Sequence, residues 1–249
     1  MKRLLLISFI FLLLSVSLDA QLWKTRRYEV SVGLGTTQFF GDIGGFSQGK
    51  NLLGLKDLIF LNTRYNISLN ARYRIMQKVS VRLNVATGKF HSTDIKGSNE
   101  NRDFSSSTSF FESAAIGEYY FIKNRLENSF IFLKGQRTSF QSLLSSIDCY
   151  AFTGVGAVSY SVTPNDLLAP RATDLKGFTP VIPLGIGIKM VYSPNFDFGL
   201  ELGARYSFTD KLDGYTSEFS KSNDIYHFFN ITFTYKIKTD ENGRLVFGR

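Results

Sequence analysis

Hydrophobic and polar side chains alternate along most of the chain with a period of two. This pattern is typical of β-strands that turn one face to an apolar environment and the other to a polar one. It predicts eight strands, at residues 28–40, 64–76, 78–91, 109–122, 148–160, 180–192, 196–209 and 224–238. Each predicted strand is long for a globular protein and long enough to cross a bilayer when tilted.

The connections between these strands alternate in length. Tight turns at 76–78 and 193–195 contrast with long polar connections at 41–63, 92–108, 161–179 and 210–223. Short turns at one end and long loops at the other indicate an all-β, eight-stranded antiparallel up-and-down transmembrane barrel, with both chain ends in the periplasm. The segment 123–147 departs from this layout because it is long on the short-turn side, and its part 139–146 is expected to form a helical turn.

The alternation divides the strands between a bulky apolar face and a face of glycine, alanine, serine and a few charged residues. An eight-stranded barrel has an interior just wide enough for its own side chains, so the bulky face is expected to point outward into lipid. In the strand at 148–160, this rule places Ala151 and Thr153 inside and the larger residues outside, namely Tyr150, Phe152, Val158 and Tyr160. Aromatic residues at strand ends are expected in interfacial girdles, namely Tyr28, Tyr119, Tyr150, Tyr160, Tyr192, Phe208 and Tyr235.

The first twenty residues predict export. A short basic start is followed by an apolar run from Leu4 to Leu18, which is typical of a secretory signal peptide cleaved near Ala20. The predicted organisation is therefore a signal peptide at 1–20, a barrel at 21–238 and a C-terminal tail at 239–249. The full chain carries a net charge of +8. An exported basic chain meets anionic lipid headgroups before nucleic acid, and a solvated basic surface explains the charge equally well.

Nine charged residues fall on the small, inward face of the predicted barrel. They are Glu29, Arg72, Arg74, Arg82, Glu112, Glu118, Lys189, Glu201 and Arg205. One interpretation is a selective pore or a proton path, and the other is a network of ion pairs that plugs the lumen. The plug is favoured because buried charges persist only when they are paired and an eight-stranded lumen is narrow.

Acidic residues also gather where the first and seventh strands end. Asp42, Asp210 and Asp213 are expected at the same extracellular rim, because closure of the barrel brings these strand ends within two strands of each other. Carboxylates there suit a divalent cation, but aspartate also accepts backbone N–H groups in turns. The turn role is favoured, and no metal site is predicted.

Catalytic chemistry has little support in the sequence. The two histidines, His91 and His227, lie at strand ends, and neither has a sequence context that supplies a nucleophile and an orienting acid. Cys149 is the single cysteine, so it forms no internal disulfide and is expected to be buried in a strand. We expect no enzyme activity and no cofactor.

Several segments resemble one known family in their order and spacing. They are Phe40-Gly41-Asp42, Arg64-Tyr65-Asn66 through Val79–Leu83 to Gly88, Glu118–Phe121, Ile182–Gly187, Glu201–Arg205 and Phe208–Asp213. Together these segments resemble the PorG-like outer-membrane barrels. The resemblance implies an eight-stranded barrel, and it implies a role at the type IX secretion apparatus, whose ring proteins such a barrel contacts from the periplasmic side.

The sequence therefore leaves several functions to compare. The first is a non-enzymatic structural or assembly component of the outer membrane, with outer-membrane lipids and periplasmic secretion-ring proteins as partners. The alternatives are a narrow channel or small-molecule transporter, a lipid-modifying enzyme of the membrane that uses His91 or His227, and a soluble ligand-binding barrel.

Overall fold

The computed structural model describes most of the expected barrel. The described residues are 25–44, 60–95, 100–123, 147–193, 195–216, 223–240 and 246. The predicted signal peptide at 1–20, its cleavage near Ala20 and the helical turn at 139–146 lie outside the described residues, as does most of the tail at 239–249. No helix in the described ranges is long and apolar enough to cross a membrane.

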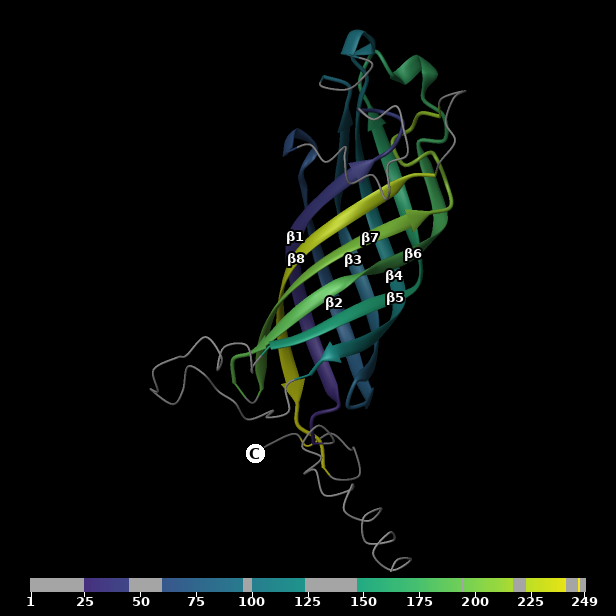
Figure 1. Cartoon of the computed structure of the whole chain (residues 1–249). Coiled ribbons are helices and arrows are strands. Elements are labelled where there is room, and N and C mark those ends of the chain that lie inside the picture. The colour runs from purple at the N-terminus through teal and green to yellow at the C-terminus, as the bar shows by residue number, and fades with distance from the viewer. Residues whose placement is uncertain are drawn as a thin grey trace, which may run out of the picture.

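Eight antiparallel strands close into a single barrel in chain order, and the last strand pairs with the first (Figure 1). The strands are β1 (Tyr28–Phe40), β2 (Arg64–Met76), β3 (Val79–Thr93), β4 (Ser105–Ile122), β5 (Ile147–Pro164), β6 (Lys176–Val191), β7 (Phe196–Ser207) and β8 (Ile225–Ile237). The predicted up-and-down barrel of eight strands is therefore confirmed, and closure leaves the sheet without a free edge along its pairing length.

The two ends of the barrel differ. Tight turns join β2 to β3 and β6 to β7 at one end, which also holds the start of β1 and the end of β8 (Figure 1). We call this the turn end. The opposite end, which we call the loop end, carries the connections that follow β1, β3, β5 and β7. It also carries three short 3₁₀ turns, η4 (Phe60–Asn62), η5 (Glu100–Arg102) and η6 (Ala169–Arg171).

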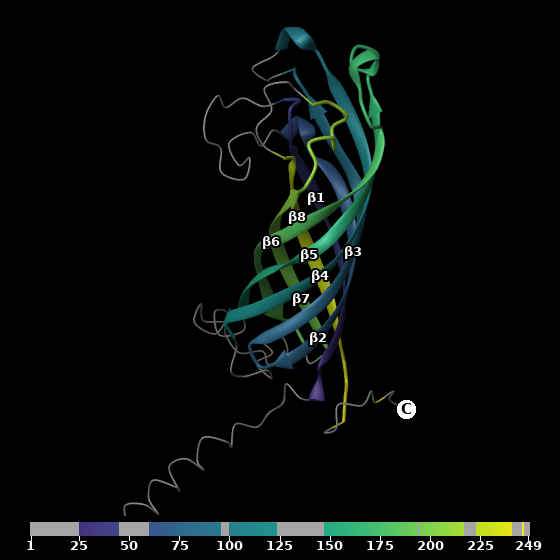
Figure 2. The same ribbon diagram turned by 90° about the vertical axis from the view of Figure 1, so that its right-hand side faces the viewer.

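One side of the barrel continues past the rest at the loop end. Strands β3 to β6 have 15, 18, 18 and 16 residues, whereas the other four have 12 or 13. They form a tall curved wall in Figure 2. The predicted loops at 92–108 and 161–179 are therefore too long, because residues 105–108, 161–164 and 176–179 pair within this wall. The serine-rich composition of these strand ends is typical of loops, so the sequence did not indicate the pairing.

The faces of β5 are the opposite of the prediction. Tyr150, Phe152, Val158 and Tyr160 are buried in the lumen rather than exposed to lipid, while Ala151 and Thr153 point outward. The glycines of the facing strands give the physical reason. A Cβ on Gly187 would lie 2.3 Å from Cζ of Tyr150, so this glycine leaves the space that the inward ring occupies.

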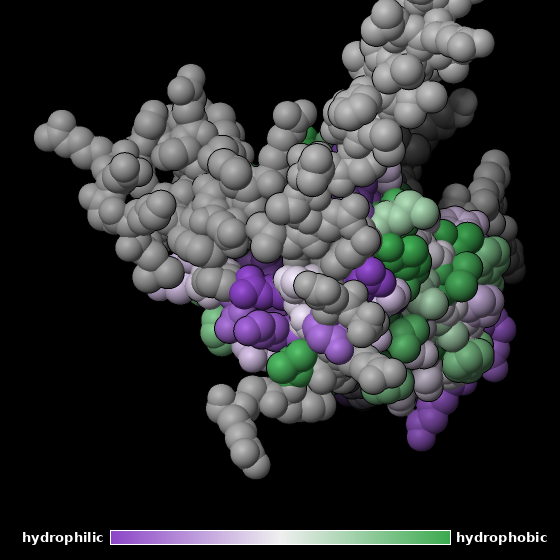
Figure 3. All heavy atoms as spheres, turned by 90° about the horizontal axis from the view of Figure 1, so that it is seen from below, coloured by the Kyte–Doolittle hydropathy of each residue, from purple (hydrophilic) through white to green (hydrophobic). Residues whose placement is uncertain are grey.

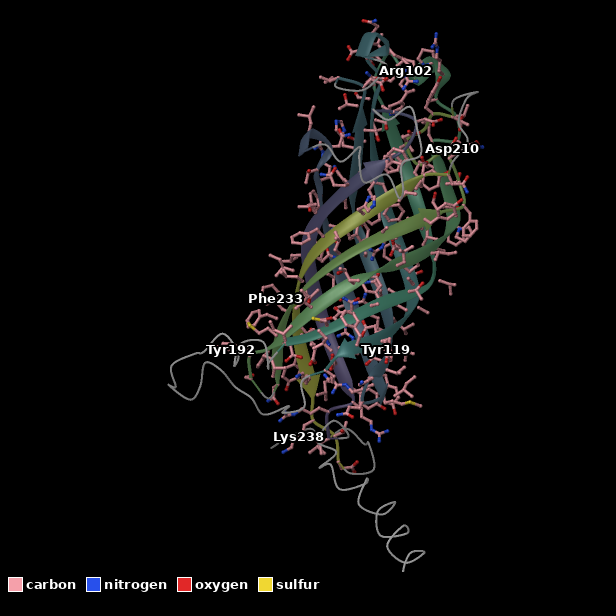
Figure 4. All side chains as sticks on the ribbon, in the orientation of Figure 1. Arg102, Tyr119, Tyr192, Asp210, Phe233 and Lys238 are labelled. Carbon is pink, nitrogen blue, oxygen red and sulfur yellow. The ribbon has the colours of Figure 1, made fainter. Side chains whose placement is uncertain are left out.

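The outer wall is an apolar belt. Its exposed side chains include Leu83 at 65%, Val155 at 67% and Phe233 at 47% of full exposure, and equivalent residues recur on all eight strands. Seen from the turn end, hydrophobic residues occupy much of the visible flank of the barrel (Figure 3). Tyr119, Tyr192 and Phe233 lie in the part of the belt nearer the turn end (Figure 4). Such a surface is favourable in hydrocarbon and unfavourable in water.

Candidate functional site

The half of the lumen nearer the turn end is filled by one network of ion pairs. Arg72 lies at its centre, with Nε 2.7 Å from Oε2 of Glu118 and Nη1 2.9 Å from Oε2 of Glu29. A second hydrogen bond of 2.9 Å joins Arg72 Nη2 to Glu118 Oε1, which makes that pair bidentate. Strands β1, β2 and β4 supply these three side chains, so the network ties distant parts of the barrel together.

Four more charged residues complete this network. Arg74 Nη2 lies 2.8 Å from Glu29 Oε1, and Lys189 contacts the other oxygen of the same carboxylate. Arg82 pairs with Glu201 and places its Nε 3.3 Å from Glu118 Oε1. All seven side chains of this network are nearly or fully buried. A buried carboxylate with three cationic neighbours, as at Glu29, is a group whose charge is fully compensated.

Glu112 and Arg205 form a separate pair nearer the loop end. Arg205 Nε lies 3.4 Å from Glu112 Oε1, and the hydroxyl of Tyr226 donates a 2.6 Å hydrogen bond to Glu112 Oε2. The Arg205 guanidinium also lies 4.1 Å from the ring centre of Phe228. The structure thus buries all nine predicted lumen charges but divides them between two levels of the barrel.

A layer of apolar side chains fills the lumen on the loop side of these charges. It consists of Phe39, Ala86, Phe90, Phe110, Val158, Tyr160, Val162, Val181, Leu212, Tyr226 and Phe228. The rings of Phe90 and Phe110 stack with centroids 4.3 Å apart and planes 4° from parallel. We call this the aromatic layer. Sequence reasoning missed it in β5 because it sent Val158 and Tyr160 outward. Gly177 on β6 was an available signal, because a Cβ there would lie 2.5 Å from the Tyr160 hydroxyl oxygen.

The lumen is therefore occupied along its length. Ion pairs fill the turn half and the aromatic layer fills the loop half. Leu212, a member of that layer, accepts a 2.6 Å hydrogen bond at its backbone oxygen from the Thr108 hydroxyl. The pairs Lys123–Asp148 and Lys236–Asp197 add further contacts near the turn end. This arrangement suits a rigid packed barrel rather than a water-filled pore.

The loops at the loop end fold onto one another. We call the described residues 41–44, 94–95, 100–104, 165–175, 208–216 and 223–224 the loop-end cap. Its small core consists of Ile43, Phe104 and Leu168, with Ala172 and Tyr215 packed against it. Arg102 joins several loops through an ion pair with Asp94 and lies 4.9 Å from the ring centres of both Phe104 and Tyr215.

The predicted acidic rim lies in this cap and includes a carboxylate that the sequence did not single out. Asp213 and Asp224 both approach Gly41, where a Cβ would lie 2.8 Å from Asp213 Oδ2 and 2.6 Å from Asp224 Oδ1. Asp42 and Asp210 lie close enough to influence both carboxyls electrostatically. Figure 4 shows Asp210 and Arg102 at the loop end.

Backbone N–H groups are the main partners of these carboxylates. Asp213 accepts hydrogen bonds from the N–H groups of Ile43 at 3.1 Å and Tyr215 at 3.0 Å, and Asp224 accepts one from Leu212 at 2.7 Å. Burial, with a further contribution from neighbouring carboxylates, raises the pKa of Asp213 to about 7 and the pKa of Asp224 well above its ordinary value. Within the described segments, no three His, Cys, Asp or Glu side chains are arranged to hold a metal ion.

The remaining candidate residues lie on the outer wall. His91 Nδ1 lies 3.1 Å from Ser107 Oγ on the neighbouring strand, and no carboxylate of a described residue hydrogen-bonds to this histidine. His227 is buried on the outward side of β8, in register with Gln38 and Ala204. Cys149 is only half-buried on the outward face of β5, so the expected burial of its thiol is wrong.

Comparison with known proteins gives a family without an assigned activity. A family model described as "Domain of unknown function (DUF6089)" matches residues 2–241. No curated protein matches the chain in sequence.

Solved outer-membrane barrels share its general architecture at low identity. Ail, the attachment invasion locus protein of Yersinia pestis, is 12% identical with a TM-score of 0.42, covering 85% of this chain and 97% of that one. Neisserial surface protein A is 13% identical with a TM-score of 0.44, covering 84% and 96%. OprG from Pseudomonas aeruginosa is 10% identical with a TM-score of 0.43, covering 86% and 97%.

Proposed function

The chain belongs to the DUF6089 family and folds as a bacterial outer-membrane β-barrel, and from this premise we propose that it is a non-enzymatic structural or assembly component of the outer membrane. The observation that carries the proposal is the occupied lumen. A barrel filled by ion pairs at one level and by stacked rings at the next offers solutes no continuous polar path. Its interaction surfaces are then its two ends and its outer wall.

The turn end is the proposed docking site for periplasmic partners. Short turns of outer-membrane barrels face the periplasm, so we place the turn end, with the start of β1 and the end of β8, on that side. The resemblance to PorG-like barrels supports a more specific role, in which this end contacts ring proteins of a type IX secretion apparatus. Outer-membrane lipids are the second class of partner, because the apolar belt needs a hydrocarbon environment.

Cross-linking in native membranes tests the assembly role. Affinity purification of the tagged barrel after cross-linking should enrich periplasmic secretion proteins, and deletion of the gene should reduce secretion. An equally tagged, unrelated outer-membrane barrel is the control for non-specific capture. If the partners of the two barrels are the same and secretion persists after deletion, the assembly role is wrong.

The channel hypothesis keeps one observation in its favour, the charged residues inside the barrel. Single-channel recording in planar bilayers distinguishes it from the assembly role. We expect no unitary conductance from the wild-type barrel. Reproducible current steps whose ion selectivity changes in an Arg82→Ala variant would instead support a channel.

The lipid-modifying enzyme rests on the contact between His91 and Ser107, the only candidate nucleophile–base pair that the described residues present. We expect His91→Ala and His227→Ala cells to keep the lipid profile of the wild type, because no carboxylate of a described residue hydrogen-bonds to His91, the histidine that contacts a hydroxyl, to orient it as a base. A changed acylation pattern of outer-membrane lipids, measured by mass spectrometry, would support the enzyme.

A further inference from the structure

Cationic and hydroxyl side chains form a regular pattern on the outer face of the tall wall. Strand register places Lys89, Ser109, Ser161 and Lys176 side by side across β3, β4, β5 and β6. We call these four residues the cationic row. The next row toward the loop end continues the same chemistry with His91, Ser107 and Thr163.

The residues just below the cationic row mark the upper edge of the apolar belt. The register aligns Thr87, Phe111, Ser159 and Phe178 in the row nearer the turn end. Phe178 is 74% exposed and Phe111 is 54% exposed. Exposed aromatic rings at the edge of an apolar belt are typical of an interfacial aromatic girdle. The cationic row therefore lies at the height where the headgroups of surrounding lipids begin.

Among the described residues, no carboxylate compensates the charge on this face. No carboxylate occurs in the three rows, which contain two lysines, one histidine, two phenylalanines and otherwise serine and threonine. Lys89 and Lys176 are both exposed, and neither forms an ion pair with a described residue. By contrast, the charged residues of the lumen are paired.

We propose that the cationic row binds the phosphate groups of outer-leaflet lipid headgroups, with Phe111 and Phe178 lying among the lipid chains below. Adjacent strands lie about 4.8 Å apart, so three spacings separate the backbones of Lys89 and Lys176 by about 14 Å. This span lets the two lysines contact separate phosphates of one bisphosphorylated glycolipid, while the serines between them donate hydrogen bonds to the sugar or phosphate oxygens. The site rests on the proposed outer-membrane location.

Lipid competition in nanodiscs tests the site. The folded full-length barrel is reconstituted in phosphatidylcholine containing a minor fraction of bisphosphorylated lipid A, and native mass spectrometry measures the lipid retained by the released protein. Lys89→Gln and Lys176→Gln should each lower the ratio of retained lipid A to phosphatidylcholine by about fivefold, the effect of one lysine at a membrane surface. Lys78→Gln removes the same charge from the opposite end of β3 and should leave the ratio unchanged.

Two further arms distinguish the possible outcomes. Replacing lipid A by its dephosphorylated form should abolish the preference of the wild type, and inorganic phosphate in the buffer should compete only weakly. Equal retention of the phosphorylated and dephosphorylated lipids, or an equal loss in Lys78→Gln, overturns the site. Membrane insertion is measured separately by heat-modifiable migration on gels. A barrel that does not insert contradicts the membrane location. A barrel that inserts without lipid preference contradicts only the cationic row.

Discussion

At the scale of single residues, the inward glycines and the inward aromatic rings of β5 depend on each other. Tyr150 is fully buried, its hydroxyl bonds to Glu201, and its ring lies 5.0 Å from that of Tyr120. Gly187 faces this ring from β6, and Gly185 faces Phe152 in the same way. A ring held by a hydrogen bond and by stacking has little freedom to move away from an added methyl group.

We expect Gly187→Ala to destabilise the barrel by about 1–3 kcal/mol, because its Cβ would overlap the ring of Tyr150. Urea unfolding in detergent micelles or vesicles measures the effect. Gly117→Ala is the matched control, because a Cβ there meets only the carbonyl oxygen of Thr153 at 3.8 Å. Combining Gly187→Ala with Tyr150→Leu should cost less than the sum of the two single changes; an additive result would show that the ring and the glycine are not coupled.

The carboxylate of Glu118 holds two arginines of the ion-pair network, Arg72 and Arg82. We expect Glu118→Gln to destabilise the barrel by about 3–5 kcal/mol, because it leaves buried guanidinium groups without a full counter-charge. Lys211→Gln removes one partner of an exposed pair with Asp174 and should leave stability unchanged. Equal unfolding midpoints for wild type and Glu118→Gln would contradict a structural role for the network.

At the scale of elements, the tall wall and the loop-end cap are one unit. The wall extends the inward faces of β3 to β6 past the belt, and the cap packs its small core against the end of the barrel. Asp213 and Asp224 bind backbone N–H groups of two cap segments, which fixes the segments relative to each other. The protonation of this pair is therefore a property of the whole cap.

Burial raises the pKa of Asp213 from 3.8 to about 7, so the folded cap favours the protonated carboxyl. The contribution of this carboxyl to the stability of the folded cap is fully present below its ordinary pKa of 3.8 and is lost as the pH rises through about 7. We expect limited proteolysis to cut the wild-type cap faster at about pH 8 than at about pH 6, after correction for the protease's own pH dependence.

Asp224→Asn should reduce this pH dependence, because it removes one of the two carboxyls whose pKa is raised. Its amide keeps an oxygen for the N–H of Leu212, and its NH₂ group replaces the unpartnered Oδ1 near Asp213. Asp174→Asn changes an exposed residue of the same cap, and this variant should be cleaved at the same rate as the wild type at both pH values. If Asp224→Asn and the wild type show the same pH dependence, the carboxyl pair does not control the cap.

At the scale of the whole molecule, the belt and the lumen reverse the usual arrangement of a soluble protein. Charged residues such as Arg72 and Glu118 are buried, while Leu83 and Val155 are among the most exposed side chains. Hydrocarbon around the belt removes the cost of that exposure, and pairing inside the barrel offsets much of the cost of burying the charges.

Leu83→Arg tests the environment of the belt. The side chain lies near the middle of β3 and is 65% exposed, so arginine there would be tolerated in water but should cost about 2–4 kcal/mol in a bilayer. Ile95→Arg is the control, because Ile95 is 56% exposed but lies at the loop end. Urea titration of folding into vesicles measures both variants, and equal stabilities would contradict a membrane position of β3.

The sequence alone determined the barrel, because a period of two repeated over eight long segments with alternating connections admits few other folds. It also identified the nine lumen charges, since charged residues on a face of glycine and serine stand out in an alternating pattern. The predicted starts of β1, β2 and β7 agree with the structure.

Only the tertiary structure decided which face of β5 is inside. Volume excludes bulky residues from a narrow lumen on average, but Tyr150 and Phe152 fit because glycines on β6 and β7 lie opposite them. These rings and glycines lie on different strands, and the sequence of one strand does not determine its register with another. The same holds for Asp224 beside Asp213 and for the cationic row, whose members are up to 87 positions apart in the chain. Alternation along one strand shows which residues share a face, but it does not show which face is inside. Contacts across the closed barrel decide that.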